Sequence, residues 1–122
     1  MSNENELRML NVQAQMISEQ LNRIDSGLME IDYLKNSIDE LGSTKENTEI
    51  LAPLSNGIFA KAKLDKVNKL LVNVGNGVVV EKTVDETKEL LDERISEMNE
   101  AREKLLDQMQ KIEDHLVKSE GK

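Results

Sequence analysis

Apolar side chains in the first third of the chain recur at alternating steps of three and four residues. The run starts at Leu7 and Leu10 and reaches Ile31 without a break. Such steps place one apolar seam along an α-helix, with Leu7 at heptad position a and Leu10 at position d. We therefore predict a helix over residues 1–42 that ends at Gly42, a residue type common just after helix C-termini.

The seam is predicted to slip once. Beyond Ile31 the next apolar residues are Leu34 and Ile38, so a step of three stands where a step of four was due. A slip of this kind, a stammer, locally overwinds a supercoil. We expect such a stammer at Leu34.

The last third of the chain repeats the same heptad pattern. Position d is apolar throughout, and position a is apolar except at Lys88 and Arg102. Thr83 and Glu86 form a T-x-x-E capping box, which predicts a helix over residues 83–118. Two helices of about 35 residues that flank a short middle segment can fold back and pair their seams. The sequence therefore predicts an antiparallel coiled-coil hairpin.

Between the two helices the hydrophobic period changes to two, which is typical of β-strands. Two Asn-Gly pairs within residues 48–82 favour tight turns, because both residue types tolerate positive φ. We therefore predict two β-hairpins. Two short hairpins make no stable core and leave strand edges unpaired, so we expect them to join strands of other subunits. The residues predicted to govern this assembly are Asn56, Gly57, Ile58, Leu70, Val72, Val74, Asn76, Gly77, Val78 and Val80.

Composition argues against an enzyme. Aromatic residues make up 2% of the 122-residue chain and charged residues 33%, which favours long helices that bury a narrow stripe. Cysteine is absent, the single histidine, His115, has no catalytic or metal-binding pattern around it, and no phosphate-binding glycine loop occurs. We therefore expect no catalytic residue, no cofactor and no metal.

The charge and hydropathy of the chain limit the kinds of partner and the cellular location that we expect. The net charge is −8, and both helical segments are acidic, which disfavours nucleic acid as a partner. No apolar run approaches the roughly 20 residues of a membrane span, and the polar start of the chain does not read as a signal peptide. We expect no membrane partner and a cytoplasmic location.

A second apolar stripe lies off the seam near the start of the first helix. Met9 and Met16 take position c and Val12 takes position f, while Leu106 and Val117 add apolar surface on the last helix. Exposed apolar patches usually mark binding sites, and methionine suits surfaces that accept varied partners. The alternatives are packing against a neighbouring arm and simple scatter. The residues predicted to bind other proteins at this end are Leu7, Met9, Leu10, Val12, Met16, Met109, Ile112, Leu116 and Val117.

The order helix, β-hairpin, β-hairpin, helix resembles the alpha class of prefoldin subunits. The resemblance covers nearly all of a single domain, residues 1–122. Its most specific part is the middle, ILAPLSNGIFAKAKL followed by KLLVNVGNGVVVEKTVDE. In the family, the alpha class has two hairpins for each subunit and the beta class has one. The resemblance implies an α+β fold, a long antiparallel coiled-coil hairpin with two β-hairpins at its base.

The same resemblance implies a function. Prefoldins hold unfolded client proteins between their arm tips without ATP and pass them to a group II chaperonin. The implied assembly is a heterohexamer of two alpha-class and four beta-class subunits. The alternative is a filament-forming structural coiled-coil protein of prefoldin-like type, whose β-strand bases polymerise. A nucleic-acid-binding arm is a third class, which the acidic ends disfavour.

Overall fold

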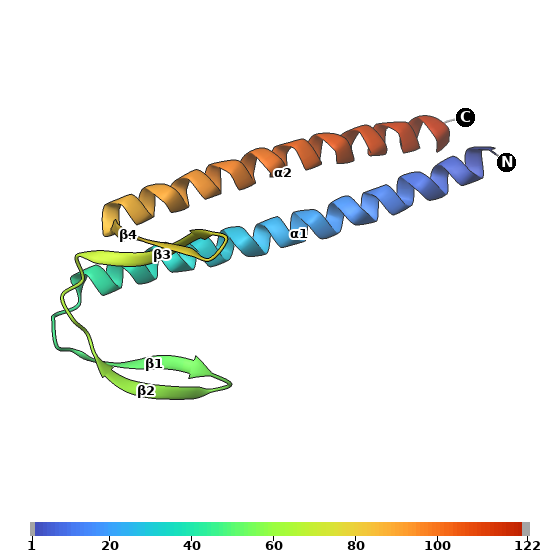
Figure 1. Ribbon diagram of the computed structural model, residues 1–122. Coiled ribbons are helices and arrows are strands. Elements are labelled where there is room, and N and C mark those ends of the chain that lie inside the picture. The colour runs from blue at the N-terminus through green and yellow to red at the C-terminus, as the bar shows by residue number, and fades with distance from the viewer. Residues whose placement is uncertain (1, 121–122) are drawn as a thin grey trace. The chain divides into compact units, whose positions relative to one another are not determined.

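The computed structural model describes the backbone of residues 2–120 and the side chains of residues 4–118. Two long helices enclose two β-hairpins in the chain order (Figure 1), which confirms the predicted α+β fold class. The contacts divide the chain into two units. We call residues up to Ile31 and from Glu93 onward the helical unit, and Asp32–Asp92 the hairpin unit. The elements are α1 (Ser2–Ser43), β1 (Glu49–Ser55), β2 (Ile58–Lys63), β3 (Lys69–Gly75), β4 (Val78–Thr83) and α2 (Val84–Glu120).

In the helical unit α1 and α2 run antiparallel, with the start of α1 beside the end of α2 (Figure 1). Asp25 Oδ1 accepts a hydrogen bond of 2.9 Å from Arg102 Nε, and Glu6 Oε1 lies 3.2 Å from His115 Nε2. The apolar a and d side chains face the opposite helix, so the predicted coiled-coil pairing is confirmed. Only Ile17 and Ile112 are buried in this unit among the described residues, because a two-stranded seam is narrow.

The predicted stammer is wrong. In the hairpin unit Leu34 is 45% exposed, whereas Lys35 is half-buried and Ile38 is buried. The heptad therefore continues unbroken, with Lys35 at position a. Counting only apolar residues misplaced the seam, because the lysine lines it with its aliphatic stem while its Nζ donates a 2.5 Å hydrogen bond to Asp92 Oδ1.

Every basic residue at an a position forms an ion pair with an aspartate at position e of the opposite helix. The hairpin unit holds two such pairs and the helical unit holds one. Polar residues at position a lower stability but specify the register of a coiled coil. The partly exposed pairs contribute modestly to stability, so we interpret them as fixing the antiparallel alignment. The pairs are Lys35–Asp92, Lys88–Asp39 and Arg102–Asp25.

The start of α2 is capped as predicted. Thr83 donates its backbone N–H to Glu86 Oε1 at 2.9 Å, and the N–H of Glu86 donates to Thr83 Oγ1 at 3.1 Å. Hydrogen bonds from the Thr83 backbone and hydroxyl, together with nearby lysines, lower the pKa of Glu86 below its ordinary value of 4.5. The buried Thr87 donates its hydroxyl to the Thr83 carbonyl at 2.8 Å, which adds a third bond to this turn.

The two hairpins repeat one another in register. Glu49 pairs with Lys63 in the first hairpin and Lys69 pairs with Thr83 in the second, so equivalent residues differ by 20 in number. Each ladder shifts register once, just before its turn, and the patterns of exposure along the equivalent strands are the same. The second hairpin is thus a structural copy of the first.

The turns of both hairpins are the two-residue turns that the Asn-Gly pairs predict. Asn56 and Gly57 have φ of 50° and 78°, and Asn76 and Gly77 have φ of 51° and 74°. Positive φ at both central residues matches the right-handed twist of the flanking strands. These values confirm the predicted turns, and each turn sets the register in which its two strands pair.

Neither hairpin has a core of its own. No residue of β1 to β4 is buried, and each two-stranded sheet leaves one edge of each strand without a backbone partner within the described residues. Isolated two-stranded hairpins are marginally stable in water at best. The strands therefore require additional packing that the described chain does not supply.

Candidate functional site

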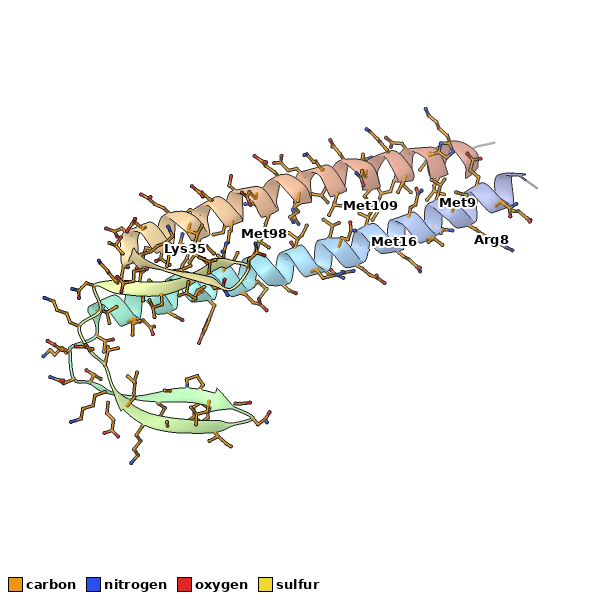
Figure 2. The ribbon with its side chains drawn as sticks, in the orientation of Figure 1. Arg8, Met9, Met16, Lys35, Met98 and Met109 are labelled. Atoms are coloured by element: carbon orange, nitrogen blue, oxygen red, sulfur yellow. The ribbon has the colours of Figure 1, made fainter. Side chains whose placement is uncertain are left out.

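The off-seam stripe on α1 is exposed to solvent. Met9 is 64% exposed, Val12 54% and Met16 56%. Figure 2 shows Met9 and Met16 along the N-terminal part of α1, with Met109 on the facing part of α2. Side chains at positions c and f lie away from the seam of a coiled coil, so their exposure follows from the heptad register. We call Met9, Val12 and Met16 the tip stripe.

The structure separates the other residues predicted to bind proteins into two groups. Val117 is 67% exposed and lies on the surface of α2. The remaining residues lie in the seam, where Ile112 is buried and the others are half-buried. A seam residue contacts a partner fully only if the helices separate, so the tip stripe and Val117 are the accessible members. The half-buried ones are Leu7, Leu10, Met109 and Leu116.

Three shallow hollows follow one side of the helical unit. The middle hollow, about 450 Å³, lies between α1 and α2 above the buried Ile17 and Ile112. Neighbouring hollows of about 290 and 420 Å³ share a glutamine with it: Gln13 on the side of the tip stripe and Gln20 on the other side. Gln108 of α2 also lines the middle hollow. We call this row of hollows the glutamine groove.

The sequence prediction missed these glutamines, although a signal was present. Gln13 and Gln20 lie at position g of α1, and Gln108 lies at position g of α2. In an antiparallel pair the g positions of both helices meet on the same side of the seam. The prediction considered only apolar positions, and a glutamine at position g is ordinary on a solvated helix, so these residues did not stand out.

The single histidine is not merely solvated. His115 Nε2 lies 3.2 Å from Glu6 Oε1, which joins the last turns of α2 to the first turns of α1. Both side chains are about half exposed, so solvent screens the pair and its contribution to stability is small. No group of three acidic or histidine side chains that could hold a metal occurs in the residues that the structure describes.

The predicted assembly residues in the strands share the even-numbered face of the hairpins and differ in their exposure. Leu70, Val72 and Val80 are half-buried, while Ile58, Val74 and Val78 are more than 40% exposed. The prediction missed a set of large exposed side chains that alternate with the half-buried positions along the strands. This second face is visible in the sequence as apolar residues at the odd positions of each ladder. Its members are Leu51, Phe59, Leu71 and Val79.

Neither described helix contains a stretch that is apolar enough to cross a bilayer. Most of the exposed large apolar residues gather in two places in the described chain, the helical unit near its termini and the hairpins, while Met29, Tyr33 and Leu34 lie along α1 between them. Scattered apolar residues on a surface are normal, but contiguous groups mark interaction sites.

Comparison with known proteins finds relatives that match most of this chain. The Prefoldin family, described as prefoldin subunit, matches residues 10–119. Prefoldin subunit alpha of Archaeoglobus fulgidus is 31% identical over 92% of this chain and 87% of its own length. That of Methanococcus maripaludis strain C7 is 36% identical over 86% and 71%, and that of Methanobrevibacter smithii is 28% identical over 90% and 75%.

A solved structure shows the same fold. The cryo-EM structure of filamentous PFD from Methanocaldococcus jannaschii superposes with a TM-score of 0.86, covering 93% of this chain and 95% of that chain at 18% identity. Prefoldins are molecular chaperones, and their subunits form oligomers with one another. By the match over most of its length and by these relatives, the chain belongs to the prefoldin family, among its alpha subunits.

Proposed function

We propose that this chain is a subunit of an ATP-independent holdase that captures non-native proteins at the tips of its arms. The observation that carries the proposal is the tip stripe, three large apolar side chains each more than half exposed near the start of α1. An unfolded client offers apolar segments of varied sequence, so its receptor needs apolar area without a fixed shape. Flexible, polarisable methionines provide such area.

We further propose that assembly occurs through the hairpins. The exposed apolar face and the open strand edges would be covered by strands of beta-class subunits, in a heterohexamer of two alpha-class and four beta-class chains. Such an assembly would bring several weak tip contacts to one client, and later contacts become intramolecular once the first has formed. Transfer of the client to a group II chaperonin, and a cytoplasmic location, stay predictions from the family resemblance.

The test replaces the tip stripe with serine. Met9→Ser, Val12→Ser and Met16→Ser together should lower apparent affinity for an unfolded client by about a hundredfold or more, since each of the three side chains buried on binding contributes about 1–3 kcal/mol. Capture is measured as suppression of aggregation without nucleotide, by the complex with a beta-class subunit. Mass and melting temperature should stay unchanged, because positions c and f lie off the seam.

Met29→Ser is the matched control, because Met29 lies on the same helix and is 74% exposed but is outside the tip stripe. It should leave client capture intact. If the triple variant captures clients as well as the unmodified complex, the tip stripe is not the binding surface. Seam residues exposed by fraying would then be the better candidates.

A filament-forming structural role is the second candidate. The similar fold from Methanocaldococcus jannaschii is that of a filamentous PFD, and an open strand edge is a physical route to polymerisation. The identity of 18% supports the fold and no more. Size measurement of the chain alone and with a beta-class partner separates the two functions. Growth to open-ended polymers under both conditions would favour the filament, and a closed particle with the partner would favour the holdase.

A further inference from the structure

The glutamine groove differs in charge from the rest of the chain. Its lining residues include four cations and no carboxylate. The whole chain, in contrast, has 24 acidic and 16 basic residues. A lining of one sign in a chain of the other sign gives the groove a local potential that attracts negative groups. The four cations are Arg8, Arg23, Lys104 and Lys111.

Two of these cations lie on the α2 rim of the groove, and Arg8 and Arg23 lie on α1. Arg23 lies 4.0 Å from Glu19, which partly offsets its charge. Lys104 and Lys111 lie one heptad apart on α2, and neither forms an ion pair with another side chain in the part of the chain that the structure describes. The α2 rim of the groove is thus its most positive part.

The floor and the shared glutamines supply two other kinds of contact. Ile17 and Ile112 give the middle hollow an apolar floor, and Met16 of the tip stripe extends it. A glutamine amide has both donors and an acceptor, as does each peptide group of a protein backbone. Within the described residues, the side-chain hydrogen bonds involve Gln110 but not Gln13, Gln20 or Gln108. These amides therefore offer hydrogen bonds whose partners do not depend on the side chains of a bound segment.

The size of the groove suits a short extended segment. It runs along α1 from Arg8 to Ile24, which spans about 24 Å at 1.5 Å for each helical residue. An extended chain advances about 3.3 Å for each residue, so about seven residues fill the groove. The middle hollow, at about 450 Å³, is within the usual volume range of ligand sites.

We propose that the glutamine groove binds an extended segment of a non-native protein, about seven residues long, that combines apolar side chains with aspartate or glutamate. Apolar side chains enter the hollows, the backbone pairs with Gln13 and Gln20, and the acidic side chains face Lys104 and Lys111. The inference rests on the proposed holdase function and deepens it, because it gives the captured segments a chemical class. Capture by an apolar surface alone has no such charge preference.

The test uses the assembled complex and two fluorescent peptides with the same apolar core, one flanked by glutamates and one by lysines. Binding is followed by anisotropy. The acidic peptide should bind about fivefold or more tightly than the basic one at low salt, and the ratio should fall as salt is raised, because salt screens the exposed lysines. Lys104→Gln with Lys111→Gln should abolish the preference. Lys45→Gln with Lys66→Gln, both outside the helical unit, removes the same two charges and should preserve the preference.

A second pair of variants tests the amides. Gln13→Met with Gln20→Met keeps the length of each side chain and adds apolar surface, but removes the hydrogen-bonding groups. Binding of both peptides should weaken about threefold to tenfold, in line with the loss of modest hydrogen bonds. A purely hydrophobic surface would bind equally or more tightly after this change, so an unchanged or stronger affinity overturns the proposal.

Other outcomes also decide the question. Equal affinity for the two peptides overturns the charge preference even if aggregation of a whole client is still suppressed, and the holdase function then stands without it. Loss of aggregation suppression in the unmodified complex overturns the holdase function itself. If the lysine variants change the mass of the complex and leave peptide binding unchanged, the groove is a contact between subunits, and the proposal fails.

Discussion

Replacement of Leu91 by alanine should cost more stability than any comparable change on the surface of α2. Leu91 is 3% exposed, the lowest fraction among the buried apolar residues. Leu→Ala removes about 2.4 kcal/mol of transfer free energy, at about 0.8 kcal/mol for each carbon lost. The total loss of stability, which includes the effect of any residual cavity, is typically about 2–5 kcal/mol. Because no described side chain is fully buried, neighbours can relax into the space. We therefore expect about 2–3 kcal/mol.

Leu106 offers a control of the same residue type on the same helix. It is 42% exposed, so Leu106→Ala should cost no more than about 1 kcal/mol and leave no cavity. The free energy of unfolding is measured by urea titration with far-UV circular dichroism at a fixed protein concentration, because assembly links stability to concentration. Equal losses in the two variants, within about 0.5 kcal/mol, would refute the assignment of Leu91 to the seam.

Two further predictions concern the hairpins and the cap of α2. Gly57→Val with Gly77→Val should impair assembly with a beta-class partner while helicity is largely kept, because a β-branched residue at positive φ costs on the order of 1–3 kcal/mol. Gly42→Val is the control, because a Cβ added there would have no heavy atom within 4 Å. A normal complex from the double variant would contradict the role of the turns. The lowered pKa of Glu86 means that its carboxylate adds stability above pH 4.5, which is lost as pH falls through the lowered pKa. Glu86→Gln, which can still accept from Thr83, should therefore flatten the acid side of a plot of melting temperature against pH, and an unchanged slope would contradict the cap assignment.

The fold could be predicted from the sequence because its signals are local. Heptad steps, the Thr83–Glu86 box and the two Asn-Gly pairs each act within a few residues, and the structure places all of them as expected. The course of the seam beyond Ile31 could not be predicted from apolar residues. Lys35 can lie in the seam only because its ammonium group pairs with Asp92, which is 57 residues away in the sequence. Such pairing is a property of two helices together.

The functional surfaces could be predicted in part for a similar reason. The tip stripe follows from the register of α1 alone, and Met9, Val12 and Met16 are exposed as the heptad requires. The glutamine groove depends on both helices, since Gln13 and Gln108 each look ordinary until the antiparallel alignment places them along one row. Sequence reasoning therefore finds the features of one helix and misses those that two helices share.

The repetition of the hairpins has an evolutionary consequence. Because equivalent residues differ by 20 in number and both ladders shift register at the same place, the two segments are interchangeable at the level of the backbone. Recombination between the two coding stretches would remove or add one whole hairpin in frame, without disturbing either long helix. Gain or loss of such a module changes the number of connectors that a subunit offers and leaves its arm intact. The number of hairpins can thus change in a single genetic step while the coiled-coil arm stays the same.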